Sequence, residues 1–298
     1  MRQYPLFFIL FVIAELIGKV YASSFNTFTS SRHLAMAGAG YLYPSTIAIK
    51  TNPSSFKKQR WIETSVIKYP ADITSQSVGI GSYKKKGCFS FSLGHLSYGV
   101  FDGYDENGLY TNTYNSSSTR ISGAYAAQIR RLPLFIGSKI SWASTNLSNE
   151  SDNALKISIG NHIVFEKIQT SIGFSLHEMN IFSTTIEEIN SVQLVASISK
   201  KLVYLPLTTY FDFCSTDFLN TGEYFFGGIF NLKNELMISF GSSSQKITQN
   251  INQSFMKTIL GATGFGLSYD TGLITIQYGN YFYGTGANAS GVSIEVKF

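Results

Sequence analysis

The end of the chain alternates apolar and polar residues one by one, and this period of two recurs along most of the sequence. Over 292–298, Val, Ile, Val and Phe alternate with Ser, Glu and Lys. A β-strand places successive side chains on opposite faces, so this period predicts strands with one apolar and one polar face. Fourteen such segments are expected at 61–68, 76–83, 87–95, 118–130, 134–142, 153–160, 168–177, 191–199, 206–214, 222–231, 235–243, 258–269, 273–282 and 290–298.

The connections between these segments alternate in length. Short turns are expected at 83–87, 131–133, 200–201, 232–234 and 270–272, and longer loops at 96–117, 143–152, 178–190, 214–221, 244–257 and 283–289. Short turns at one end and long loops at the other are typical of a membrane barrel, and an even strand count places both chain ends on the short-turn side. The sequence therefore predicts an all-β fold: an antiparallel transmembrane β-barrel of about 14 strands.

Composition agrees with a barrel and excludes other classes. Charged residues make up 14% of the 298 residues and aromatics 15%, whereas disordered chains have many charges and few aromatics. A mean hydropathy of +0.07 is too low for a bundle of membrane helices.

Charge also follows the connections. Lysines and arginines gather at the short turns (84–86, 130–131, 200–201, 233), and acidic residues gather in the long loops (102, 105–106, 150, 152, 187–188). Solvation of the two rims explains this pattern. Docking of a periplasmic partner on the basic rim is the alternative.

The first sixty residues differ from the rest. Residues 1–22 have the features of a secretory signal peptide: Arg2, an apolar run at 6–14 and small or short residues before Ser23. A retained N-terminal anchor is the alternative. Residues 23–60 contain many small residues and the turn signal Asn52-Pro53. We expect 23–60 to form a short N-terminal plug or periplasmic segment before a barrel at 61–298.

No catalytic, metal or nucleic-acid motif stands out. The four histidines lie outside the known metal spacings, and the positive charge is dispersed. The acidic loop around Asp105 lacks the spacing of a calcium loop. The two cysteines, Cys88 and Cys214, are expected to be free and buried, with a disulfide as the alternative. We therefore expect a non-enzymatic protein without cofactor or metal that binds no nucleic acid.

Two stretches carry a family resemblance. Residues 34–40, followed by Ala48 and Asn52-Pro53-Ser54, resemble the start of FadL-like outer-membrane proteins. The loop at 95–108 is similar to that of the PorV/PorQ family of the type IX secretion system, as are the segments 227–230, 239–241 and 264–269. The sequence departs from that family at 112–115, where the family's Thr-Phe-x-Ala motif is replaced by Asn-Thr-Tyr-Asn. The resemblance implies a fourteen-stranded outer-membrane component of protein secretion.

Two main functions follow as expectations. The first is an outer-membrane scaffold or shuttle for secretion-system proteins or secreted cargo. The alternative is a FadL-like channel for hydrophobic small molecules such as long-chain fatty acids, which the apolar run 179–182 favours. A structural barrel with no transport role is a third hypothesis.

Site residues can be assigned for these readings. Phe298, on the apolar face of the last expected strand, is the candidate signal for barrel insertion, and outer-membrane lipid is an expected partner of the barrel. The candidate partner-binding residues are Asp102, Tyr104, Asp105 and Glu106 outside, and the candidate plug residues are Gly38, Gly40, Asn52 and Pro53, of which Asn52 and Pro53 are also inner contact candidates.

Overall fold

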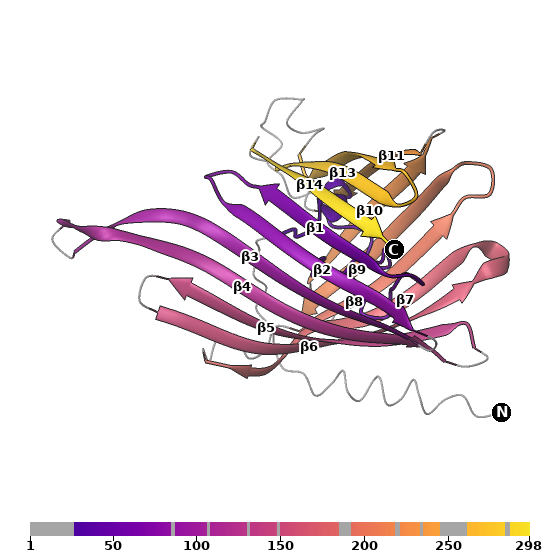
Figure 1. Ribbon diagram of the computed structural model, residues 1–298, viewed down its shortest axis with the longest axis horizontal. Helices are drawn as coiled ribbons and strands as arrows, with labels where there is room; N and C mark the ends of the chain where they lie inside the picture. Colours follow the sequence, from indigo (N-terminus) through magenta and orange to yellow (C-terminus); the bar gives the residue numbers. More distant parts are fainter. Residues whose placement is uncertain are drawn as a thin grey trace.

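The computed structural model describes residues 27–84, 87–105, 108–129, 132–147, 150–184, 192–217, 221–232, 235–244, 261–283 and 287–298. The expected signal peptide and Glu106 lie outside these ranges. In the described part, fourteen strands form a closed barrel (Figure 1). They are β1 (Trp61–Lys68), β2 (Thr74–Lys84), β3 (Gly87–Tyr104), β4 (Tyr110–Gln128), β5 (Leu134–Leu147), β6 (Glu150–Phe165), β7 (Thr170–Ser183), β8 (Gln193–Lys201), β9 (Leu207–Asp217), β10 (Thr221–Asn231), β11 (Leu236–Ser243), β12 (Thr263–Asp270), β13 (Ile274–Phe282) and β14 (Asn288–Lys297).

Each strand pairs antiparallel with its neighbours in sequence, and β14 closes the barrel on β1. The predicted fold class is therefore confirmed. Closure pairs the strands on both sides around the barrel wall, which is what allows a sheet to cross a membrane, while the outer ends of strands such as β3 and β4 extend beyond one of their described neighbours. We call the end with the C-terminus the inner end and the opposite end the outer end.

The two faces of the sheet have opposite chemistry. In β1, Ile62 and Val66 point outward and are 40% and 53% exposed, while Glu63 points inward and is 2% exposed. Other strands repeat this pattern, with serines buried on the inside and large apolar side chains exposed on the outside. An apolar exterior around a polar interior is typical of a barrel whose outer surface contacts lipid.

The wall has very unequal height. β3 and β4 contain 18 and 19 residues, whereas β1 and β11 contain eight each. At ~3.4 Å per residue, β3 is ~60 Å long, well beyond the ~25 Å of an apolar belt. Figure 1 shows β3 and β4 extending past the other strands. We call residues 96–117 the outer hairpin.

The prediction of long loops is wrong over much of three segments, where strands continue instead: 96–117, 143–152 and 178–190. β3 and β4 pair up to Tyr104 and Tyr110, β5 and β6 approach to within two residues, and β7 continues to Ser183. Beyond the membrane both faces of a strand meet water, so backbone pairing continues while the alternation that reveals a strand in the sequence is lost.

Residues 27–60, here called the luminal segment, lie inside the barrel. Their one helix, α2 (Ser31–Ala35), contacts β12, β13 and β14. Met36 and Tyr41 pack with Phe225 of the wall, and Phe28 and Leu34 pack in a second cluster with Tyr281. The hydrophobic core of the protein is thus the contact between the luminal segment and the wall.

Other sequence expectations concern single residues. Cys88 and Cys214 are both free and buried, as expected. Tyr69 and Tyr281 are buried inside the barrel, where the Tyr69 hydroxyl contacts the backbone of Phe28. Among the described residues, no helix has the length and apolar character needed to cross a membrane.

Candidate functional site in the lumen

The wall approaches the luminal segment most closely at glycines. A Cβ placed on Gly160 of β6 would lie 2.2 Å from Oδ1 of Asn52, and one on Gly241 of β11 would lie 2.1 Å from the backbone oxygen of Met36. Any side chain at these positions would displace the segment. These two glycines therefore shape the wall to fit residues 27–60.

Asn52 ties the luminal segment to β6 and β7. Its Nδ2 donates to the backbone oxygens of Asn161 at 3.1 Å and Phe174 at 3.3 Å, and its Oδ1 accepts from the backbone N–H and the hydroxyl of Ser54. Asn52 is fully buried, and Pro53 lies against Gly137. Both residues face the wall, so neither offers a surface to an inner partner.

The turn after α2 is held by an acidic residue of the wall. Gly38 and Gly40 adopt φ values of +91° and +95°, which L-residues with side chains rarely adopt. The N–H of Gly40 donates to Asp212 Oδ2 at 2.7 Å, and its carbonyl lies 3.1 Å from Nε2 of the buried His33. The two glycines therefore allow a tight turn that places a backbone donor on Asp212.

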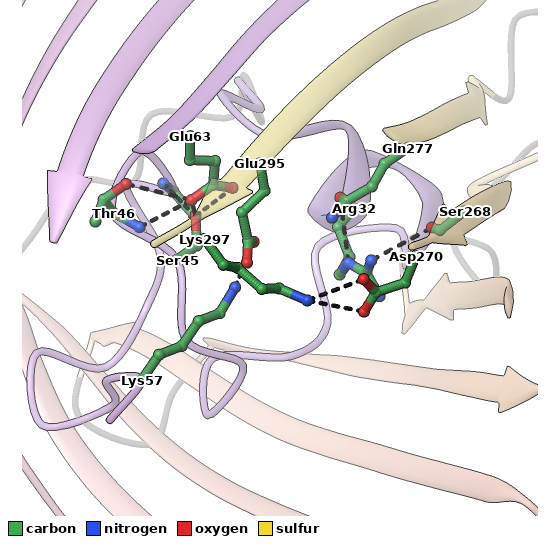
Figure 2. A network of polar contacts seen from close by, with 11 residues as sticks. Arg32, Ser45, Thr46, Lys57, Glu63, Ser268, Asp270, Gln277, Glu295 and Lys297 are labelled. Atoms are coloured by element: carbon green, nitrogen blue, oxygen red, sulfur yellow. Dashed lines mark hydrogen bonds and ion pairs between the residues drawn. The ribbon is translucent and has the colours of Figure 1, made fainter. Parts of the chain in front are cut away.

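A charged network holds the segment at the seam where the barrel closes. Glu63 of β1 and Glu295 of β14 are register partners, and both are 2% exposed. Lys57 forms an ion pair with Glu295, while Ser45 and Thr46 donate to Glu63. Figure 2 shows both carboxylates beside the loop that supplies these partners. The network thus brings two like charges together and supplies their donors from the luminal segment.

A second polar group lies nearby on β12 and β13. Arg32 donates from Nε to Gln277 at 3.2 Å and from Nη2 to Ser268 at 3.3 Å (Figure 2). Its guanidinium also lies 4.7 Å from the ring centre of Tyr43. Arg32 is 3% exposed, so its charge is satisfied by neutral acceptors and a ring face.

The luminal segment separates two cavities. The outer cavity, about 280 Å³, is lined by residues that include Thr29, Ser92, Ser118, Arg120, Lys139 and Lys156. The inner cavity, about 290 Å³, is lined by residues that include Arg32, Tyr43, Lys57, Asp270, Glu295 and Lys297. Residues of the segment line both cavities, Thr29 and Ile49 on the outer one and Arg32 and Lys57 on the inner one.

The outer cavity contains an ion cluster that the sequence analysis missed. Glu178 of β7 accepts from Arg120 of β4 at 2.5 and 3.1 Å, and Lys156 of β6 lies 3.5 Å away. Glu178 has φ +59° at an irregularity in the β6–β7 pairing. Such a bulge redirects a side chain, here toward the lumen. Lys156 stands on the polar face of an alternating stretch in the sequence, which was the available signal for its inward position.

The candidate partner-binding residues lie on the outer hairpin. Asp102 and Tyr104 are in β3 and exposed, and Asp105 closes the turn by accepting from the N–H of Leu109 at 2.8 Å. Glu106 lies outside the described residues. Phe298, the candidate insertion signal, is 61% exposed at the inner end and donates its N–H to Arg60.

Metal and nucleophile chemistry finds little support in these residues. In the part of the chain that the structure describes, no three His, Cys, Asp or Glu side chains gather to hold a metal ion. Ser54 lies 2.8 Å from His162 Nδ1, but its hydroxyl also lies 2.7 Å from Asn52 and is buried under the luminal segment. The arrangement anchors the segment rather than exposing a nucleophile.

Comparisons with solved structures identify similar barrels. The P. putida toluene transporter TodX matches with a TM-score of 0.55 and 10% identity over 90% of this chain and 98% of that chain. A Pseudomonas aeruginosa FadL homologue matches with a TM-score of 0.55 and 9% identity over 94% and 99%. A deltaS2 mutant of the TodX monoaromatic hydrocarbon channel matches with a TM-score of 0.52 and 12% identity over 90% and 97%. At such identities the similarity shows a shared barrel fold. No protein-family model and no curated protein sequence matches the chain.

Proposed function

We propose that this protein is a non-enzymatic outer-membrane β-barrel that admits small molecules to its lumen, with the luminal segment as an internal gate. The observation that carries the proposal is the pair of cavities on either side of residues 27–60. The strands around the segment form a closed barrel. A shift of the segment would therefore open a path between the two cavities inside that barrel.

Two further observations support this function. The exterior is apolar and the interior polar, which suits a barrel in an outer membrane. The structurally similar proteins include a toluene transporter and a monoaromatic hydrocarbon channel. These neighbours favour hydrophobic small molecules as the first solutes to test.

The contacts of the segment suggest how it is retained. Lys57 and Thr46 bind acidic residues at the β1–β14 seam, and Asn52 binds backbone carbonyls of β6 and β7. These anchors are polar and lie on opposite parts of the wall. Polar anchors can exchange with water when the segment moves, whereas the apolar contacts of Met36 and Leu34 with the wall would have to be exposed or repacked.

The experiment is a flux assay on the purified full chain in liposomes. Entry of a monoaromatic hydrocarbon and of small polar solutes is compared for the wild type and Lys57→Met, which removes the cation beside Glu295. We expect faster entry through Lys57→Met for at least one solute class. Lys58→Met, at the exposed neighbouring position, is the matched control. Equal entry through all three proteins and empty liposomes contradicts the proposal.

A second function, a scaffold for protein secretion of the PorV/PorQ kind, has one specific observation in its favour. Large apolar side chains are exposed on the outer hairpin: Val100, Tyr104, Leu109 and Tyr110 are 58–67% exposed. Exposed apolar groups next to acidic residues such as Asp102 are common in interaction sites.

The scaffold reading is tested on the outer hairpin alone. Tyr104→Ser with Tyr110→Ser should leave folding and flux unchanged and abolish co-purification of a partner from solubilised outer membranes. Phe89→Ser with Tyr125→Ser, an exposed ring pair lower on the same two strands, is the control. Identical sets of co-purifying proteins from the wild type and the hairpin variant contradict this reading.

A further inference from the structure

The outer cavity contains more positive than negative charge. Arg120, Lys139 and Lys156 line it, and one carboxylate, that of Glu178, faces them. Asp152 is an acidic residue of the lining itself, and it accepts a hydrogen bond from Thr184, just after β7. The five groups sum to one positive charge, or to two without Asp152.

These groups are partly shielded from solvent. The side chains of Arg120, Lys156 and Glu178 are 22%, 13% and 16% exposed. Charges in a confined, partly desolvated cavity interact more strongly than on an open surface, and a cavity dominated by one sign concentrates ions of the opposite sign. The outer cavity is therefore electrostatically suited to an anion.

Each basic side chain is held in place. Glu178 binds Arg120 through both of its oxygens, and Lys139 donates to the backbone oxygen of Ile49 at 2.8 Å. An ammonium group has three N–H donors. Lys139 can therefore donate to a ligand while keeping its contact with Ile49, and Arg120 stays oriented by Glu178.

The rest of the lining is mixed, with hydroxyl residues beside apolar ones such as Ile47, Leu93 and Leu96. Ser92, Ser118, Ser122 and Thr145 supply hydroxyl groups to the lining. The Ser122 hydroxyl contacts Ser141, and that of Thr145 donates to Ser118. Hydroxyl groups can donate to a carboxylate. A hydrocarbon would leave these groups and the charged cluster without the water that solvates them.

We propose that the outer cavity is a binding site for a small hydrophilic carboxylate, held by Lys139, Lys156 and Arg120. This inference rests on the proposed function in one respect, because it names the class of solute that would enter the lumen from outside. The ligand departs from the hydrocarbons named for the structurally similar barrels. Lys139 also connects the site to the luminal segment through Ile49, so an anion that competes for this lysine would weaken one contact of the segment.

The test is equilibrium binding to the purified full chain in detergent at low salt, with succinate as the probe. Calorimetry should give saturable binding, weakened about tenfold by Lys156→Met, which removes one charge-assisted contact. Glu178→Gln should tighten binding several-fold, because it removes the competing negative charge while the amide oxygen can still accept from Arg120. A residue with a purely structural role would not give this increase. Lys201→Met, at an exposed position of the inner end, is the charge-matched control and should bind like the wild type.

Two outcomes overturn the inference: no saturable succinate binding, whether or not myristate binds, and equal weakening by Lys201→Met. Heat-dependent mobility on gels identifies variants that fail to fold, and in that case Lys156→Gln replaces Lys156→Met. Equilibrium binding does not require the lumen to open. A failure here therefore leaves the flux test of the gate untouched, and a failure of the gate leaves succinate binding unaffected.

Discussion

Glu63 and Glu295 lie directly opposite each other across the seam between the first and last strands, and both are buried. Two ionised carboxylates on such paired positions repel each other unless a cation or hydrogen-bond donors compensate their charge. Lys57, Ser45 and Thr46 of the luminal segment provide that compensation. Closure of the barrel and docking of the segment therefore depend on one another.

Lys57→Met should destabilise the docked segment by about 3–5 kcal/mol, the range for removing one partner of a buried ion pair. Chemical unfolding and trypsin sensitivity of the folded protein in detergent measure this loss. Adding Glu295→Gln to Lys57→Met should restore part of the stability, because the uncompensated charge is gone. Lys58→Met should behave like the wild type, and an equal loss there would contradict the role of Lys57.

Gly160→Ala should displace Asn52 from β6, because the new Cβ would lie 2.2 Å from its Oδ1. Overpacking of this kind costs about 1–3 kcal/mol. Gly94→Ala is the matched control, since Gly94 also lies within a strand and its Cβ would meet no atom within 4 Å. Similar unfolding free energies for the two variants would show that docking of the luminal segment does not require a glycine at position 160.

His33 should make the docked segment sensitive to acid. Burial above all, together with the charges of Arg32, Lys50 and Lys139, lowers the pKa of His33 from 6.5 to about 4, although its hydrogen bond to Gly40 acts in the opposite direction. The released segment binds the proton more readily than the docked one. The contribution of neutral His33 is therefore complete above about pH 6.5, falls as the pH drops toward 4 and amounts to about 3 kcal/mol.

The measurement is unfolding free energy against pH for the wild type and His33→Gln. The difference between the two curves should change between pH 6.5 and 4, which isolates His33 from the other titrating groups. His95→Gln, on the exposed surface of β3, is the matched control variant. Parallel curves for the wild type and His33→Gln would contradict the burial of a neutral imidazole.

The two cysteines should react only after unfolding. Cys88 and Cys214 are free and buried, so a maleimide reagent should add to neither in the folded barrel and to both in denaturant. Mass spectrometry counts the additions. If maleimide adds to neither cysteine in denaturant without a reductant, the two cysteines instead form a disulfide.

The sequence predicts the barrel well because lipid and lumen impose opposite chemistry on alternate residues. The period of two locates all fourteen strands, and in β14 it already places Glu295 on the polar face. The ends of β3, β4 and β7 could not be predicted, because no such contrast exists outside the membrane.

The site itself depends on distances that no local pattern contains. Arg120 and Glu178 belong to β4 and β7, with two strands between them, and meet only through the bulge at Glu178. Glu63 and Glu295 become neighbours only when the barrel closes with a particular register. Asn52 was identified from a turn signal, but its partners are backbone carbonyls of β6 and β7, which no side-chain pattern reveals.

The most direct test of the gate is to lock the luminal segment to the wall. A Cβ on Gly227 of β10 would lie 2.9 Å from the Cβ of Ala39, so a small shift brings the pair into the range of a disulfide. We propose Ala39→Cys with Gly227→Cys in a background of Cys88→Ala and Cys214→Ala, reconstituted in liposomes. The account predicts that solute flux stops when the pair is oxidised and returns on reduction. Equal flux in both states would show that solutes do not pass by movement of residues 27–60.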